Sequence, residues 1–110
     1  MVLIIPEAQL YLQNLALILY EKEYFGFEDS ARKYVIDLFE DIKKTLPIRQ
    51  HKPAPKYFDK YGKGMKYAVF KKNKRTSWYV FFTIYEDEKT GEDIFLIRYV
   101  GNNHTVTQYL

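Results

Sequence analysis

The chain contains no cysteine among its 110 residues. This absence excludes disulfide bridges, thiolate metal sites and cysteine nucleophiles, and it is compatible with a reducing cytoplasm, where we expect the protein to reside. The sequence also lacks a glycine-rich phosphate loop, a Ser/His/Asp arrangement and His/Asp metal-ligand spacing. Enzymes that depend on a phosphate-binding loop, a Ser/His/Asp triad or a His/Asp metal site therefore have little support. We expect neither a metal nor a cofactor.

Long hydrophobic runs are missing as well. Residues 1–20 are rich in apolar side chains, but Glu7, Gln9 and Gln13 interrupt them, and no basic segment precedes them. A bilayer-spanning helix needs about 20 consecutive apolar residues. We therefore expect neither a signal peptide nor a membrane anchor.

What the chain does contain is an unusually large share of aromatic side chains. Hydrophobic residues make up 47% of the sequence and aromatic residues 18%, a composition that argues against disorder. The length suits one two-layer core and is too short for two independent ones. We therefore expect a single domain over residues 1–110.

Acidic side chains are almost absent from the middle of the chain. From Lys43 to Arg75 every charged residue except Asp59 is basic, whereas acidic residues predominate elsewhere. The cations in this stretch are interleaved with aromatic residues: Tyr57, Phe58, Tyr61, Tyr67 and Phe70. Lysines neutralise phosphates and aromatic faces stack on bases, so the pattern favours a nucleic-acid surface. A solvated, lysine-rich loop is the alternative interpretation.

Apolar periodicity predicts the order of the secondary structure. A short strand over Val2–Ile5 ends at Pro6. Two helices and three strands follow, over residues 7–23, 28–46, 65–72, 77–85 and 94–100. The segment 48–63 contains Pro53 and Pro55 and has no period, so we expect it to be a loop.

This order predicts an α+β fold with two layers. In the arrangement β-α-α-β-β-β, the helical hairpin would cover one face of a mostly antiparallel, twisted sheet and leave the other face open. The strand over 77–85 is apolar on both sides. One side carries Trp78, Val80, Phe82 and Ile84, and the other carries Tyr79, Phe81, Thr83 and Tyr85.

Only one side of that strand can be covered by the two helices. We expect the side with Tyr79, Phe81 and Tyr85 to bind a partner. The alternatives are that a C-terminal segment or a homodimer covers it.

The topology and three stretches of sequence carry a family resemblance. The stretches are Lys56–Gly62, Lys74–Phe82 and Leu96–His104. Together they resemble the RelE/ParE superfamily of type II toxin–antitoxin toxins, and in particular a subgroup of small RelE/ParE-like proteins of unassigned function. The resemblance covers nearly the whole chain, and it implies a RelE/ParE-like fold.

The resemblance implies the toxin component of a toxin–antitoxin system, held inactive by a small antitoxin protein. RelE-like toxins cut mRNA on the ribosome without a metal, by attack of the 2′-hydroxyl on the adjacent phosphate. ParE-like toxins instead inhibit DNA gyrase and cleave nothing. Ribosome-dependent mRNA cleavage is the preferred prediction here. Gyrase inhibition, or a protein- or RNA-binding module without cleavage, is the alternative.

His104 is the best candidate for acid–base chemistry. Cleavage by the 2′-hydroxyl needs a proton acceptor, and imidazole titrates in the useful range. His104 also matches the place after the last strand where some RelE-like toxins carry a histidine. The alternative is that Asn102, Asn103 and His104 form a hydrogen-bonded turn or cap. We interpret His51 as an exposed loop residue.

Basic residues would hold the phosphates. Arg98 lies within the last strand, so its charge must reach the open face or a carboxylate such as Glu86, Asp87 or Glu92. RelE-like enzymes hold the scissile phosphate with arginines on the sheet, and the resemblance implies this role for Arg98. Arg75 lies at the hairpin turn beside the same sheet and would help to position the phosphate, with ordinary solvent exposure as the alternative. The expected nucleic-acid contacts are Lys63, Lys66, Lys71, Lys72, Lys74 and Arg75.

The chain departs from the family pattern at two places. Trp78 stands where many RelE-like enzymes have a basic residue, so one cation for the transition state is missing. The C-terminal tail that usually carries a catalytic tyrosine is short, and Tyr109 is the residue that would substitute.

Overall fold

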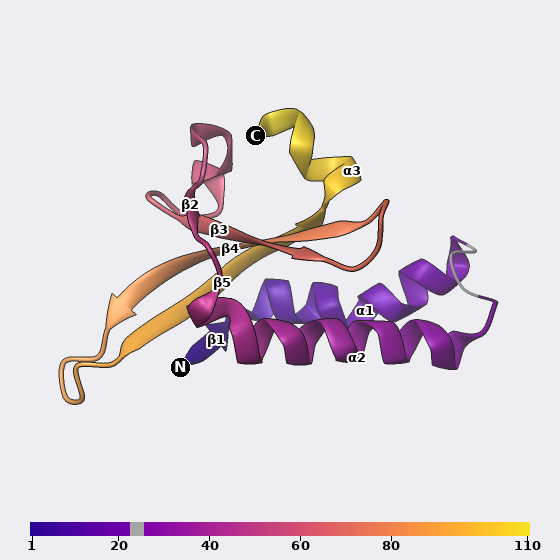
Figure 1. Cartoon of the computed structure of the whole chain (residues 1–110), viewed down its shortest axis with the longest axis horizontal. Helices are drawn as coiled ribbons and strands as arrows, with labels where there is room; N and C mark the ends of the chain where they lie inside the picture. The colour runs from indigo at the N-terminus through magenta and orange to yellow at the C-terminus, as the bar shows by residue number, and fades with distance from the viewer. Residues whose placement is uncertain (23–25) are drawn as a thin grey trace.

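The computed structural model describes residues 1–22 and 26–110 (Figure 1). Its helices and strands are β1 (Val2–Ile4), α1 (Pro6–Glu21), α2 (Glu28–Thr45), β2 (Lys52–Pro53), β3 (Lys66–Lys71), β4 (Ser77–Glu86), β5 (Asp93–Asn102) and α3 (Asn103–Val106). Short 3₁₀ helices are η1 (Leu46–Ile48), η2 (Lys56–Lys60) and η3 (Thr107–Tyr109). The predicted α+β order is confirmed, and β2, α3 and the 3₁₀ helices are additions to it.

The strands form one mixed sheet of five strands in the order β1-β5-β4-β3-β2. Strand β1 runs parallel to β5, and every other neighbouring pair is antiparallel. The prediction of a mostly antiparallel sheet is therefore confirmed. Among the described residues, no helix is long and apolar enough to cross a bilayer.

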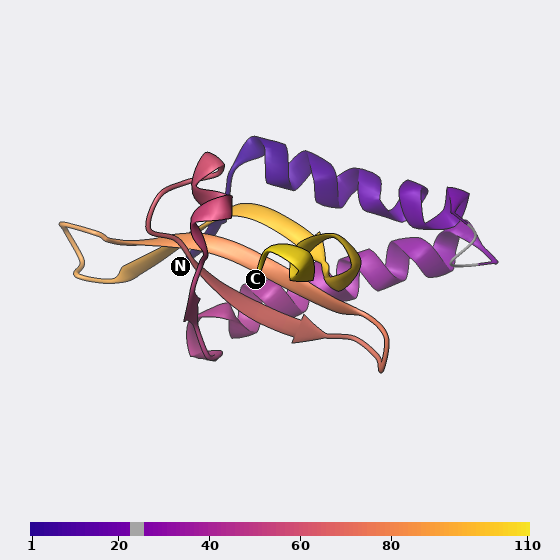
Figure 2. The same cartoon turned by 90° about the horizontal axis from the view of Figure 1, so that it is seen from above.

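The helical hairpin covers one face of the sheet, as Figures 1 and 2 show. Trp78, Val80 and Phe82 alternate along β4 and are buried beneath Leu38 and Ile42 of α2, within the larger of two hydrophobic cores. Full burial of a large apolar side chain stabilises the fold by about 1.5–3 kcal/mol. The predicted inward set of β4 is thus confirmed for these three residues.

His51 belongs to this helix side of the molecule, and its interpretation as an exposed loop residue is wrong. Its ring is half-buried, edge-on to Phe82 and Phe95 at centroid distances of 4.8 and 5.8 Å. Its Nε2 lies 2.8 Å from the carbonyl oxygen of Leu46. The chain folds back after η1, which carries His51 against the end of the core.

The face of the sheet opposite α1 and α2, which we call the second face, is covered at its centre. This corrects the expectation of a two-layer fold with one open face. Phe58 of η2 and Val106 of α3 are buried with Phe81 of β4 and with Met65, and they form a second, smaller core. In Figure 1 these short segments lie above the sheet, on the side away from α1 and α2. The alternative in which a C-terminal segment covers this face is therefore correct in part, because α3 supplies Val106 while the internal segment η2 supplies Phe58.

A β-bulge sets the direction of two side chains on this second face. Phe81 pairs with Tyr99 and Phe82 pairs with Ile97, so Arg98 is the extra residue in β5. The bulge places Arg98 and Tyr99 next to each other on the same face. Without it, strict alternation would turn one of them toward the helices.

Candidate nucleic-acid interface

The connection between β3 and β4 is a tight turn that carries the densest group of cations. We call residues Lys71–Arg75 the basic turn. The backbone N–H groups of Lys72 and Asn73 both donate to the carbonyl of Thr76, at 3.0 and 3.3 Å. The Asn73 side chain accepts a hydrogen bond from the Arg75 backbone N–H at 2.9 Å. This local network leaves the side chains of Lys74 and Arg75 exposed to solvent.

Asn103 fastens the start of α3 to the basic turn. Its side-chain oxygen accepts from the Ser77 N–H at 3.1 Å, and its side-chain nitrogen donates to the Arg75 carbonyl at 3.0 Å. Asn102 caps α3 by accepting from the backbone N–H groups of His104 and Thr105. The hydrogen-bonded cap, which was the alternative interpretation of this segment, is therefore present, and His104 is exposed.

A small cavity of about 140 Å³ opens between the basic turn and α3. Its lining includes His104, Asn73 and Asn102 on the polar side and Tyr34 and Trp78 on the aromatic side. Trp78 Nε1 donates to the Tyr34 hydroxyl at 2.8 Å, which fixes this wall. Ligand pockets usually measure about 300–1,000 Å³. The cavity is therefore too small for a whole nucleotide.

The Arg98 side chain reaches the second face, which was one of the two expectations; the other was an ion pair with a carboxylate. Its Nε donates to Thr83 Oγ1 at 2.9 Å and its Nη2 to the Tyr85 hydroxyl at 2.7 Å. Gly62 leaves room for the stem, because a Cβ there would lie 2.7 Å from Arg98 Cδ. Both hydrogen-bond partners are neutral, and among residues 1–22 and 26–110 no ion pair involves Arg98. The guanidinium charge is therefore available to an anion.

The structure does not bring the three expected catalytic residues together. His104 and Arg75 both lie toward the end of the sheet where Asn102 pairs with Trp78, and Asn103 joins their two segments. Arg98 lies four residues back along β5, or about 13 Å at the rise of an extended strand. Arg98 and His104 therefore cannot hold the same phosphate in this arrangement.

Tyrosines gather on the second face around η2 and the C-terminus. Tyr57 and Tyr109 stack with centroids 3.5 Å apart and planes inclined by 3°, and Tyr61 and Tyr99 stack at 4.1 Å. Lys60 Nζ donates to the Tyr57 hydroxyl at 3.0 Å and lies 4.2 Å from its ring centroid. We call these five residues the tyrosine cluster.

Hydrogen bonds and burial shift the pKa values of two tyrosines in the tyrosine cluster in opposite directions. Hydrogen bonds from Tyr109 and then Lys60 lower the pKa of Tyr57. Desolvation, followed by the influence of Tyr61, raises the pKa of Tyr99 to about 12. Three members, Tyr57, Lys60 and Tyr61, come from the aromatic–lysine pattern of the sequence. The pattern missed their partners, because Tyr99 and Tyr109 are distant in the chain.

The other predicted contact residues are spread over several surfaces. Lys63 is exposed beside Gly62, while Lys66 alternates with the buried Ala68 and therefore lies on the helix side of β3. Lys72 is half-buried, with its Nζ 5.7 Å from the Tyr34 ring centroid. The predicted cations thus do not form one continuous patch.

Three aromatic residues named from the sequence are core residues. Phe58, Phe70 and Phe81 are at most 1% exposed, so none can accept a base or a partner at the surface. The expectation that Phe81 contacts a partner is therefore wrong, because Phe58 stacks over it at 4.3 Å. Of the two other expected partner residues, Tyr79 is half-buried and Tyr85 is exposed.

Within the part of the chain that the structure describes, no group of three or more His, Cys, Asp or Glu side chains lies close enough to hold a metal ion.

Comparison of the chain with protein-family models, curated proteins and solved structures found no match.

Proposed function

We propose that this chain is a RelE/ParE-type, toxin-like protein that binds RNA through the basic turn and the adjoining second face of the sheet. The observation that carries the proposal is the pair of hydrogen bonds from Asn103, which join the start of α3, where His104 lies, to the basic turn, where Lys74 and Arg75 are exposed. Solvated Lys and Arg side chains bind phosphates and release condensed counterions. Tyr57 and Tyr109 of the tyrosine cluster are partly exposed on the second face, and aromatic rings of this kind stack on bases.

Arg98 supports the same proposal from a different position. A charged group held only by the hydroxyls of Thr83 and Tyr85 is oriented without being neutralised. An RNA strand that crosses the second face would place one phosphate at the basic turn and another at Arg98. Arg98 then positions the strand.

Cleavage is the finer part of the proposal. The His104 imidazole would accept the 2′-hydroxyl proton while that oxygen attacks the adjacent phosphorus. A 2′,3′-cyclic phosphate forms as the bond from phosphorus to the 5′-oxygen breaks, and the leaving 5′-oxygen takes a proton from water. Arg75 belongs to the turn that Asn103 joins to α3, and its guanidinium would stabilise the charge on the phosphorane. Positioned acid–base groups contribute about 10²–10⁴-fold in rate.

The proposal includes a cognate antitoxin as the protein partner. Tyr85 is exposed and Tyr79 is half-buried, so both can contribute to such a contact, whereas Phe81 cannot. An acidic segment would be attracted to the basic turn, and burial of apolar area on the tyrosines would supply affinity.

A translation extract with ribosomes and a defined mRNA tests the proposal. We expect the wild-type chain to cut the mRNA, and His104→Ala to lose about 10²-fold or more in cleavage rate while it still binds RNA. Arg98→Ala should weaken RNA binding. Lys44→Ala, which changes an exposed lysine of α2, is the control and should change neither RNA binding nor cleavage.

The outcomes separate the two parts of the proposal. An intact mRNA with wild-type protein would contradict cleavage, and absence of RNA binding would contradict the whole proposal. Inhibition of gyrase supercoiling without RNA binding would point to the ParE-like alternative.

A further inference from the structure

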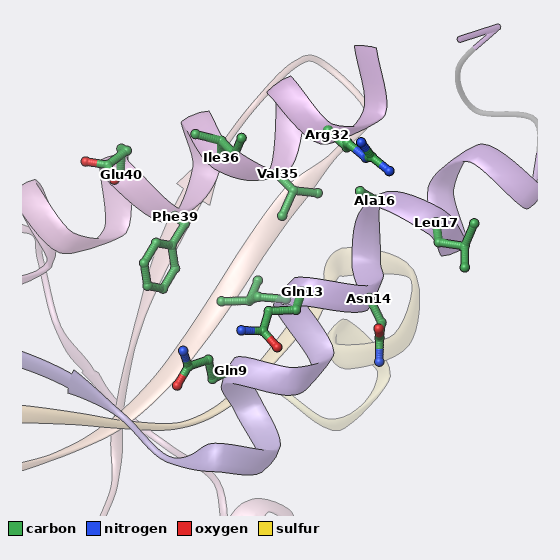
Figure 3. A pocket seen from close by; sticks show the side chains of 11 residues that line it. Gln9, Gln13, Asn14, Ala16, Leu17, Arg32, Val35, Ile36, Phe39 and Glu40 are labelled. Carbon is green, nitrogen blue, oxygen red and sulfur yellow. The ribbon is translucent and has the colours of Figure 1, made fainter. Parts of the chain in front are cut away.

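The surface groups of this chain that a one-electron oxidant can attack are tyrosines. The chain has no cysteine, and Trp78, its one tryptophan, is 1% exposed. A groove of about 550 Å³ between α1 and α2 (Figure 3) has no tyrosine or tryptophan among the described residues that line it. The tyrosine cluster on the second face is therefore the place where exposed, oxidisable rings lie side by side.

Tyr57 and Tyr109 are two exposed tyrosines whose rings lie face to face. Their centroids are 3.5 Å apart and their planes are inclined by 3°. Tyr57 is 41% exposed and Tyr109 is 38% exposed, so an oxidant in solution can reach both rings. Tyr20 and Tyr85 are equally exposed, but neither stacks on another tyrosine among the residues that the structure describes.

A hydrogen bond between the two hydroxyls points both rings in the same direction. Tyr109 donates to the Tyr57 oxygen, and Lys60 Nζ donates to the same oxygen at 3.0 Å. Because both hydroxyls lie at the same end of the stack, the Cε carbons next to them face each other. In a phenoxyl radical these carbons carry much of the unpaired electron, and they are the atoms through which two tyrosyl radicals join.

The two rings are held together by segments that are themselves anchored. Tyr57 belongs to η2, whose next residue, Phe58, is buried and stacks on Phe81 at 4.3 Å. Tyr109 is the last residue of η3, which directly follows α3 and its buried Val106. The stack is therefore formed before any reaction, and coupling within one molecule is favoured over coupling between molecules.

The second stack of the tyrosine cluster offers a comparison inside the same molecule. Tyr61 and Tyr99 also lie nearly parallel, at 4.1 Å, but both are half-buried. Burial raises the pKa of Tyr99 to about 12. Oxidation of a phenol to its radical releases the hydroxyl proton, so a buried phenol that retains its proton is the poorer substrate.

We infer that Tyr57 and Tyr109 form an oxidative modification site, at which a one-electron oxidant of the peroxidase class joins the two rings into dityrosine. Each phenol loses one electron and one proton and becomes a phenoxyl radical. One bond forms between a Cε carbon of each ring, and the hydrogens on these two carbons move to the phenolic oxygens. For each cross-link, one hydrogen peroxide is reduced to two waters. The product fastens η3, and with it α3, to η2 and requires no RNA.

Limited oxidation of the dilute, purified full chain with a peroxidase and hydrogen peroxide tests the inference. We expect a monomer with the blue fluorescence of dityrosine, a mass lower by two hydrogen atoms, and a cross-linked pair of peptides that contain residues 57 and 109. Tyr57→Phe and Tyr109→Phe should each lower the intramolecular yield about tenfold or more, since phenylalanine keeps the ring but forms no phenoxyl radical.

Tyr20→Phe and Tyr61→Phe are the matched controls. Tyr20 is 40% exposed and outside the cluster, and Tyr61 belongs to the half-buried stack. Both variants should leave the intramolecular yield unchanged. Absence of dityrosine, cross-links only between molecules, a cross-link that joins Tyr61 to Tyr99 instead, or a yield that Tyr57→Phe leaves intact would each overturn the inference.

Urea unfolding of the oxidised monomer gives a second measurement. A covalent link between η2 and η3 closes a long loop of the unfolded chain and lowers its entropy, so the unfolding midpoint should rise relative to the untreated chain. Tyr57→Phe treated with the same oxidant should unfold at the midpoint of its own untreated form. A midpoint that stays unchanged in oxidised wild type would contradict the fastening of η3 to η2.

Discussion

The two faces of the sheet bury similar side chains by different means. On one face, Trp78 and Phe82 lie beneath helices of 16 and 18 residues. On the other, Phe81 lies beneath η2 and α3, which contain five and four residues. The helix side encloses the larger core, whereas the short segments cover only the middle of the second face. The rim of that face keeps its tyrosines and cations at the surface.

The two faces also differ in the groups that contact the guanidinium of their arginines. On the helix side, Arg49 lies 3.9 Å from the Phe70 ring centroid and forms an ion pair with Asp41 at 3.0 Å. On the second face, Arg98 meets the hydroxyls of Thr83 and Tyr85. A carboxylate neutralises a guanidinium, and a hydroxyl only orients it. This difference supports our proposal that RNA binds on the second face.

Phenylalanine truncations should show the largest difference between the two cores. We expect Phe82→Ala to lower the free energy of unfolding by about 3–5 kcal/mol, since the surrounding helices cannot close the cavity. Phe58→Ala should lower the free energy of unfolding by about 1–3 kcal/mol. The loss is smaller because η2 is short and can move into part of the cavity that the substitution leaves. Urea unfolding measures both values. A larger loss for Phe58→Ala would make the second core the dominant one.

Gly101 tests how closely α3 approaches the sheet. A Cβ at this position would lie 2.6 Å from Val106 Cγ2 and 3.2 Å from the Tyr99 hydroxyl. Gly101→Ala should therefore displace α3 and cost about 1–3 kcal/mol. Gly26→Ala is the matched control, because no atom lies within 4 Å of a Cβ built there, and it should change stability by less than about 0.5 kcal/mol. Equal effects of the two variants would contradict the close packing of α3.

Tyr99 should give the second face a pH-dependent stability. Burial raises the pKa of its phenol from 10.0 to about 12, so the unfolded chain releases this proton at a lower pH than the folded chain. The contribution of the neutral phenol is fully present below pH 10 and is lost between pH 10 and about 12. Unfolding of wild type and Tyr99→Phe should differ by a constant amount below pH 10, and wild type should lose stability relative to the variant above it. A relative gain of wild-type stability above pH 10 would contradict this assignment.

Periodicity explains how much of the fold could be predicted. Val35, Leu38 and Ile42 recur at helical spacing, and the residues of β4 alternate, so the sequence alone indicates the hairpin, the strands and the helix-facing core. Segments η2 and α3 are too short to show a period. The contact of Phe58 with Phe81 joins positions far apart in the chain, and no local signal indicates it.

The site was less predictable than the fold, for the same reason. Sequence patterns selected Arg98, Arg75 and His104 by residue type and by resemblance, but they give no distances. The fastening of Arg75 to α3 depends on the Asn103 side chain, and the separation of Arg98 depends on the register of β5. The direction of Arg98 further depends on a bulge that alternation does not predict.

The most direct test of the account is the salt dependence of RNA binding in two matched pairs of charge reversals. Lys74→Glu with Arg75→Glu changes adjacent exposed cations on the basic turn, and Lys43→Glu with Lys44→Glu makes the same change on α2. We predict that wild-type affinity falls steeply with salt, and that the first pair reduces the slope of log affinity against log salt by up to about 1.4, or 0.7 per phosphate contact. The second pair should leave the slope unchanged. Salt-independent affinity, absence of binding at low salt, or equal effects of the two pairs would contradict the account.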